Sequence, residues 1–362
     1  MPQRSVLVDG LKVLASQLIV LHHIALYAPM ADRVAPAWPW LHALLLDEAR
    51  FVVQIFLVIG GFLAAQGLSR HAPGLLRALG TRYLRLVPML AVALLAVLAA
   101  SALLPPGRWP DWVTPWPGAG DLLAHLLLLQ DVLGIPSLSA GVWYVSIDFQ
   151  LYALLALGAA LLHRRAGRPV WRTPLPWAVA ALTLASAAWL NREPRLDVWA
   201  PYFFAAYGLG ALAAWARCSR ATGALFAVVG GLLLAAAAFE PRPRLLVAAL
   251  TAMALVALAA RGPLPGRLGR WLGFWSDASY AVFLIHYALI VAATALWLRL
   301  GPAGSMAAWT LLALTWAASL AAGAALQRGV GRPLSLAGSR VPRAQGGDGC
   351  ASGTGTTSTT KR

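Results

Sequence analysis

Long apolar segments recur along most of the chain, and they constrain its fold more than any other feature. A helix that crosses a membrane needs about 20 mostly apolar residues. Of the 362 residues, 60% are hydrophobic and 12% are charged, whereas a soluble protein carries about 25% charged residues. The sequence therefore predicts an all-α polytopic integral membrane bundle of about ten transmembrane helices, with no soluble catalytic domain. The predicted spans are residues 7–28, 50–69, 82–104, 142–162, 177–190, 199–216, 222–239, 243–260, 278–299 and 305–327.

Basic residues collect in the short segments between the apolar runs, and they give the chain a formal net charge of +16. With the N-terminus placed in the cytoplasm, the inner segments hold 20 Lys and Arg residues and the outer segments hold 8. This asymmetry follows the positive-inside rule, which predicts two cytoplasmic termini for a multi-pass protein of the plasma (inner) membrane. The pattern indicates a lipid bilayer as the partner of the chain and argues against nucleic acid.

The chain divides into a membrane domain, residues 1–340, and a polar tail, residues 341–362. The tail is rich in Gly, Ser and Thr and lacks an apolar pattern, so we expect it to be disordered and cytoplasmic. The long outer connection 105–141 contains an amphipathic stretch, 121–133, which is too short to span and predicts a surface or re-entrant helix. Its tryptophans fit either anchors at the membrane interface or a substrate-binding surface; they are Trp109, Trp112 and Trp116.

The first span carries ionisable residues, which are costly in lipid and therefore need a reason to be there. Lys12 and His23 are eleven residues apart, which places them within about 20° of one another around a helix. Ser16 and Asp9 lie near the same stripe, whereas His22 points about 100° away from His23. Such a stripe is typical of a helix face that lines a cavity inside the bundle. The alternative is that both histidines only form structural hydrogen bonds.

The fourth span repeats polar groups on one helix face, with Tyr144, Asp148 and Tyr152 at intervals of four residues. Asp148 is predicted at about the same depth as His23. A carboxylate that orients a neutral imidazole makes it a general base near neutral pH. A structural ion pair between two helices is the alternative interpretation of the same residues.

Two more groups of the membrane region have a chemical interpretation. Arg82 and Arg85 are predicted at the cytoplasmic edge of the third span, where they share a face and their guanidinium groups suit phosphate oxygens. Topology anchoring by the positive-inside rule is the simpler explanation. His286, midway along the ninth span, is a further buried ionisable residue that needs a partner.

Two of these motifs resemble the membrane acyltransferase family 3, the O-antigen and exopolysaccharide O-acetylase type. Lys12, followed after ten residues by His23, is similar to the family's Arg or Lys, ten residues, then His in its first span. Arg82-x2-Arg85-x2-Pro88 is similar to the family's Arg-x-x-Arg-x-x-Pro.

Three further segments resemble the same family in the same order. Residues 56–63 resemble a Phe-Phe-Val-Leu-Ser-Gly-Phe-Leu segment, with Gly60 where Ser is usual. Residues 143–152 resemble a Trp-Ser-Leu-Ser-Val-Glu-x-Gln-Phe-Tyr segment, with Asp148 in place of Glu. Residues 279–287 resemble a late Ser-Tyr-x-x-Tyr-Leu-x-His segment that ends near His286.

The resemblance implies a membrane-bound O-acyltransferase that uses an acyl-CoA co-substrate, with acetyl-CoA expected, and no tightly bound cofactor or metal. The acceptor would be a hydroxyl group of a glycan or of another envelope or secreted molecule. His23 is then expected to be the general base and Asp148 the residue that orients it, while Lys12, Arg82 and Arg85 bind the donor. The expected supporting residues are Asp9, Ser16, Tyr144, Ser146, Tyr152 and His286.

Two other classes of protein fit part of the pattern. A proton-coupled secondary transporter also has many spans with buried Asp, His and Lys, but it often shows two related halves, which this sequence does not. A non-catalytic membrane subunit leaves the polar stripe of the first span unexplained.

Overall fold

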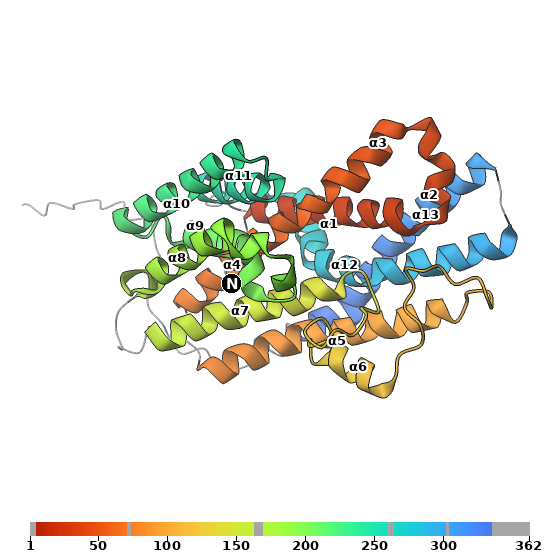
Figure 1. Cartoon of the computed structure of the whole chain (residues 1–362), viewed down its shortest axis with the longest axis horizontal. Coiled ribbons are helices and arrows are strands. Elements are labelled where there is room, and N and C mark those ends of the chain that lie inside the picture. The colour runs from red at the N-terminus through yellow and green to blue at the C-terminus, as the bar shows by residue number, and fades with distance from the viewer. Residues whose placement is uncertain are drawn as a thin grey trace, which may run out of the picture.

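The computed structural model describes residues 5–70, 74–162, 169–258, 262, 264–301 and 304–334, and those parts of the chain contain helices and turns but no strand. The predicted tail 341–362 lies outside the described residues. A helix is present at each of the ten predicted spans (Figure 1). These helices are α1 (Val6–Tyr27), α4 (Val53–Arg70), α5 (Leu75–Ser101), α7 (Val142–Leu162), α8 (Leu175–Ala188), α9 (Ala200–Trp215), α10 (Arg220–Phe239), α11 (Pro243–Leu258), α12 (Gly266–Leu300) and α13 (Ser305–Leu326).

The helices differ in length more than the apolar runs predict. In the described residues, seven helical segments are long and apolar enough to cross a membrane. Three of the ten are shorter: α8 has 14 residues, and α9 and α11 have 16 each. At 1.5 Å per residue they reach only about 21–24 Å, less than the ~30 Å of a typical hydrocarbon core. Figure 1 shows α8 to α11 gathered toward one end of the bundle.

Both ends of the described chain lie on one side of the bundle, which we call the terminal side. Asp9, near the start of α1, accepts a hydrogen bond of 2.6 Å from Ser276 in the first third of α12. Arg328, just after α13, lies over the ring of Phe274 on the same part of α12. The opposite end is the loop side, where Arg299 at the end of α12 donates to the carbonyl of Leu103 after α5. The chain therefore passes an even number of times between the terminal side and the loop side.

Helix α5 begins seven residues earlier than predicted, because residues 75–81 continue the helical pattern after Gly74. Arg82 therefore lies about 10 Å along α5 and not at the first residue of the helix, where the sequence predicted it. Helix α12 also begins early, at Gly266, and is 35 residues long.

The α4–α9 pair is the tightest contact of the bundle, and glycines make it possible. A Cβ atom on Gly61 would overlap the carbonyl of Tyr207, and one on Gly210 would overlap the carbonyl of Val58. Small residues let membrane helices approach at backbone distance. The Gly60–Gly61 part of the family-like motif in residues 56–63 is thus explained by helix packing.

We expect Gly61→Ala to destabilise the protein, because the added methyl group meets backbone atoms that cannot rotate away. Overpacking of this kind costs about 1–3 kcal/mol or more. Thermal unfolding in detergent measures the effect. Gly67→Ala on the same helix is the matched control, since nothing lies within 4 Å of a Cβ there. Equal melting temperatures for the two variants would contradict the tight α4–α9 contact.

The connection between α5 and α7 folds back into the bundle. Its short helix α6 (Ala119–Leu126) ends where the Leu126 carbonyl accepts a hydrogen bond of 2.8 Å from the Tyr83 hydroxyl of α5. Gln130, which is fully buried, donates to the Ser146 hydroxyl of α7 at 2.7 Å. The predicted helix at 121–133 is therefore shorter than expected, and the residues after it enter between helices, as a re-entrant segment does.

Between α1 and α4, a second connection packs on the loop side. It contains α2 (Pro29–Val34), α3 (Pro39–Ala43), a π-helical turn (Leu44–Glu48) and a 3-10 turn (Ala49–Val52). Its π-helical turn is held by His22 of α1, whose Nδ1 lies 2.7 Å from the Leu45 carbonyl. This contact places the segment over the end of α4.

Candidate active site

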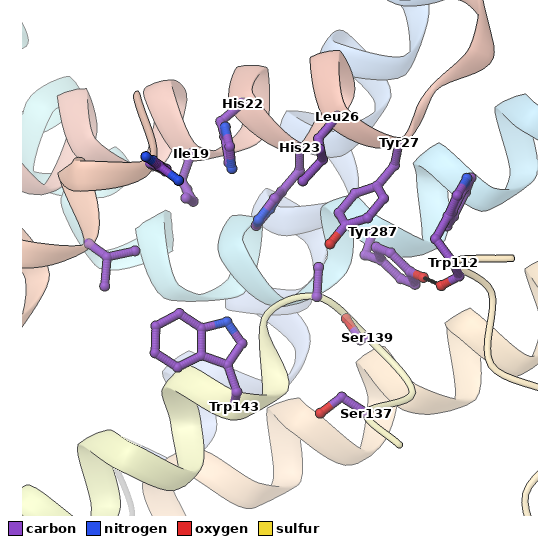
Figure 2. A pocket seen from close by; sticks show the side chains of 13 residues that line it. Ile19, His22, His23, Leu26, Tyr27, Trp112, Ser137, Ser139, Trp143 and Tyr287 are labelled. Atoms are coloured by element: carbon purple, nitrogen blue, oxygen red, sulfur yellow. Dashed lines mark hydrogen bonds between the residues drawn. The ribbon is translucent and has the colours of Figure 1, made fainter. Parts of the chain in front are cut away.

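A cavity of about 370 Å³ lies between α1, α12 and the re-entrant connection (Figure 2). Its walls are rich in aromatic side chains and carry two serine hydroxyls and one arginine. The lining residues include His22, His23, Tyr27, Arg50, Trp112, Ser137, Ser139, Trp143 and Tyr287. Rings of this kind present flat apolar faces with polar edges, a surface suited to a partly polar ligand.

His23 forms a hydrogen-bonded pair with His286, the predicted buried histidine of α12. His23 Nδ1 lies 2.7 Å from His286 Nε2. His286 is fully buried, and its Nδ1 has no hydrogen-bond partner among the described residues. His23 is thus the partner that the sequence predicted for His286.

The two rings share one hydrogen bond, and which ring donates it depends on the tautomer. We assign a proton to His286 Nδ1, the tautomer that leaves a lone pair on the ring of His23. His286 Nε2 is then an acceptor, and His23 Nδ1 donates to it. The remaining nitrogen of His23, Nε2, carries a lone pair, and the His23 side chain lines the cavity. A neutral imidazole held in this way can accept a proton from a bound group.

Asp148 does not pair with His23, which corrects the predicted partnership. Its carboxylate forms a salt bridge of 2.5 Å with Arg82 of α5. The reason is the order of the helices: α7 packs against α5 and α9, whereas α1 packs against α12 and α4. The sequence places His23 and Asp148 at similar depths but does not say which helices are neighbours.

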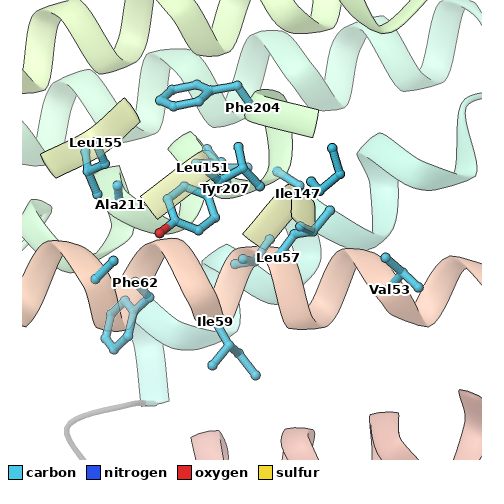
Figure 3. Close-up of a cluster of buried hydrophobic side chains, with 14 of the residues drawn as sticks. Val53, Leu57, Ile59, Phe62, Ile147, Leu151, Leu155, Phe204, Tyr207 and Ala211 are labelled. Carbon is cyan, nitrogen blue, oxygen red and sulfur yellow. The ribbon is translucent and has the colours of Figure 1, made fainter. Parts of the chain in front are cut away.

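Arg82 is the centre of a second polar group, which lies toward the terminal side of the His23–His286 pair. Its side chain is 22% exposed and lies over the ring of Tyr152, 5.2 Å from the ring centroid. Tyr207 of α9 is fully buried beside this pair, and its hydroxyl has no hydrogen-bond partner among the described residues. Figure 3 shows its ring between α4 and the leucines of α7. Sequence reasoning missed Tyr207, because one tyrosine in an apolar helix carries no distinctive signal.

Arg85 lies one turn beyond Arg82 and is exposed. It interacts electrostatically with Arg82, Asp277 and Tyr280. The side chain of Arg85 is exposed, whereas that of Arg82 is mostly buried and forms an ion pair with Asp148. Of the two predicted phosphate-binding arginines, Arg85 has the more exposed side chain.

The other predicted residues of the first span lie on the terminal side of His23. Asp9 is buried against Ser276, and the hydroxyl of Ser16 donates to the carbonyl of Val13 in its own helix. Lys12 is half-buried. Asp9 and His23 both face α12, in agreement with the shared polar face that the spacing predicts.

Rings separate the two polar groups. Phe283 of α12 packs edge-on against Tyr144 of α7 at 5.3 Å and lies 6.3 Å from Phe56 of α4, measured between ring centroids. Tyr144 and Phe56 are 6.1 Å apart, which closes a three-ring cluster. On its other side, Phe283 lies 6.0 Å from the ring of His286. We call Phe56, Tyr144 and Phe283 the aromatic cluster.

The sequence matches a known protein family over most of its length. The model of an acyltransferase domain family, Acyl_transf_3, matches residues 6–326, nearly the whole described chain. The chain belongs to acyltransferase family 3. As a family 3 protein with many apolar helices, it is a multi-pass membrane acyltransferase domain, and neither the transporter nor the non-catalytic subunit is supported.

A curated relative of this family 3 chain is the Regulator of hypoxia-inducible factor 1 of Caenorhabditis elegans. It is 29% identical over 127 residues, which are 33% of this chain and 25% of that protein. The match thus spans about a quarter of the relative's length. No solved structure matches the chain.

Ser146, a predicted supporting residue, accepts a hydrogen bond from Gln130 of the re-entrant connection. Of the three tryptophans, Trp112 lines the cavity, while Trp116 is 59% exposed. Within the described residues, no group of His, Cys, Asp and Glu is arranged to hold a metal ion.

Proposed function

We propose that this membrane acyltransferase moves an acetyl group from acetyl-CoA to a hydroxyl group of a glycan or related envelope molecule, with His23 as the general base. The observation that carries the proposal is the His23–His286 pair at the cavity wall. In the assigned tautomer His23 Nε2 keeps a lone pair for a proton, and the His23 side chain lines the cavity.

The reaction follows from that geometry. The acceptor hydroxyl gives its proton to His23 Nε2 as its oxygen attacks the thioester carbonyl carbon of the donor. The C–S bond then breaks, and the thiolate of CoA leaves and takes the proton from the imidazolium. His286 keeps the ring of His23 oriented through both steps, and the acetyl ester remains on the acceptor.

The donor is expected to enter from the terminal side. Arg85 has an exposed side chain on α5, and Lys12 lies about 16 Å from His23 along α1, toward the terminal side. Guanidinium groups form strong charge-assisted hydrogen bonds with phosphate oxygens. Arg82 is already paired with Asp148, so it would line the path of the donor and would not bind a phosphate group by itself. Asp148 is then a positioning residue, because it holds the side chain of Arg82.

The acceptor is expected to occupy the cavity from the loop side. The indole rings of Trp112 and Trp143 and the rings of Tyr27 and Tyr287 line it together with serine hydroxyls. Flat aromatic faces beside hydroxyl groups suit a sugar ring, which has apolar C–H faces and polar edges. The acceptor and the donor would then approach His23 from opposite sides and meet at its imidazole.

The direct test is transfer of radiolabelled acetyl from acetyl-CoA to envelope polysaccharide by the purified protein. The proposal expects label in the polysaccharide and an equal amount of free CoA. Consumption of acetyl-CoA without any labelled product, or no consumption at all, would contradict it.

Donor binding gives a separate prediction. Arg85→Ala should raise the KM for acetyl-CoA by roughly 10- to 150-fold, the loss of one charge-assisted hydrogen bond of about 1.5–3 kcal/mol, and should leave the KM for the acceptor unchanged. Arg77→Ala is the matched control, an exposed arginine two turns earlier on α5. If both variants keep the donor KM of the wild type, Arg85 serves only as a topology anchor.

Membrane orientation gives another prediction. Both termini should face the cytoplasm of a plasma (inner) membrane, with the loop side outside. Reporter fusions after Leu334 and within the connection at Pro110 should therefore report opposite compartments. The same compartment at both positions would overturn the proposed direction of the reaction.

A further inference from the structure

The aromatic cluster occupies the space between the two polar groups. From Tyr144 to Asp148 is one turn of α7, about 6 Å toward the terminal side. From Phe283 to His286 is three residues of α12, about 4.5 Å toward the loop side. Because Tyr144 and Phe283 are in contact, the Arg82–Asp148 pair and the His23–His286 pair are about 10 Å apart along the bundle, with the rings between them.

Phe283 is the ring of this cluster that reaches the histidine pair. Its side chain is 5% exposed and packs between His286 and the backbone of Gly141. A Cβ atom on Gly141 would lie only 3.1 Å from two carbons of the Phe283 ring. Ala140, the residue before Gly141, and Trp143, two residues after it, line the cavity. The Phe283 ring therefore fills the volume directly behind the cavity wall.

We propose that Phe283 sets the size of the acyl group that the protein transfers. This inference rests on the proposed function, in which the thioester carbonyl must come within about 3–3.5 Å of the acceptor oxygen near His23. Atoms of the acyl chain beyond that carbonyl need room beside the histidine pair, and Phe283 occupies it. An acetyl group adds one methyl group there, whereas a butyryl group adds three carbons and meets the ring.

Gly141 is a second position at which a substitution should change the volume available to the acyl group. A methyl group at residue 141 would push against the Phe283 ring and reduce the available volume. Removing the ring and adding the methyl group should therefore change the acyl-group preference in opposite directions. A residue with a merely structural role would lower all rates together and leave the preference unchanged.

The test compares release of free CoA from acetyl-, propionyl- and butyryl-CoA by the full-length protein in lipid nanodiscs, with envelope polysaccharide as acceptor. A single methylene in an apolar pocket changes specificity by roughly 10- to 200-fold. Phe283→Ala should raise the ratio of butyryl to acetyl turnover at least about 10-fold, and Gly141→Ala should lower the ratio of propionyl to acetyl turnover. Phe226→Ala, a buried phenylalanine of α10 outside the site, should leave both ratios as in the wild type.

Unchanged ratios in Phe283→Ala and Gly141→Ala, with an active wild type, would overturn this inference and leave the proposed function in place. If the wild type releases no CoA from any of the three donors, the proposed function fails, and this inference fails with it. Should Phe283→Ala not fold, Phe283→Leu carries the same test, because it removes part of the ring and fills more of the space. Its expected change in ratio is smaller and has the same direction.

Discussion

His23→Ala should reduce acyl transfer by about 10²–10⁴-fold, the usual cost of removing a general base. The loss should fall on kcat, because the imidazole acts on the acceptor proton and not on donor binding. His23 is buried against His286 at the cavity wall. The measurement is the rate of acetyl transfer at saturating acetyl-CoA, with the melting temperature of each variant as the control for folding.

His22→Ala is the matched comparison for this prediction. His22 also lines the cavity, but its Nδ1 is bound to the Leu45 carbonyl, so its main contact is with the backbone of the loop-side connection. We expect a milder loss of activity for this variant. An inactive His22→Ala together with an active His23→Ala would show that the base is the other histidine.

The variant His286→Ala distinguishes the loss of the base from the loss of the residue that orients it. His286→Ala keeps the base but removes the acceptor of the His23 Nδ1 proton, so it should lower kcat and change the pH profile of the reaction. In His23→Ala, the pH dependence of kcat that comes from the catalytic base should be absent. Identical pH profiles for the wild type and His286→Ala would contradict the assigned protons.

Arg82→Ala should destabilise the bundle strongly. It leaves the carboxylate of Asp148, 6% exposed, without its partner. Breaking one side of a buried ion pair typically costs about 3–5 kcal/mol, because an uncompensated charge stays behind. Thermal unfolding in detergent, followed by intrinsic fluorescence, should show a large decrease in melting temperature.

The double variant Arg82→Met with Asp148→Leu tests the cause of that loss. Apolar residues of similar size that replace both partners are often neutral for stability. The double variant should therefore melt well above Arg82→Ala, although both lack the arginine. If it is no more stable than Arg82→Ala, the loss comes from Arg82 packing over Tyr152 and not from the unpaired carboxylate.

Much of the bundle could be predicted from the sequence, because apolar length and helical periodicity act locally. The ten helices follow from the apolar runs, and the eleven-residue spacing of Lys12 and His23 identified the residue that lines the cavity. The start of α5 could not be placed as well, since residues 75–81 are helical but less apolar. Arg82 was therefore predicted at the first residue of the helix, whereas it is two turns along it.

The partners of the site residues could not be predicted, because they depend on which helices are neighbours. Asp148 meets Arg82 and His23 meets His286 across contacts between segments far apart in the chain. The cavity wall at Trp112 comes from a connection without a membrane-helix pattern. Its position depends on single hydrogen bonds, such as that from Tyr83 to Leu126, which carry no periodic signal.

The central claim is that the donor reaches His23 from the terminal side while the acceptor occupies a cavity on the loop side. Inverted and right-side-out membrane vesicles from expressing cells test it directly, because added acetyl-CoA does not cross the bilayer. The account predicts release of CoA and labelled envelope polysaccharide only in inverted vesicles, where the terminal side faces the added donor. Equal activity in right-side-out vesicles, with no activity gained on inversion, would contradict it.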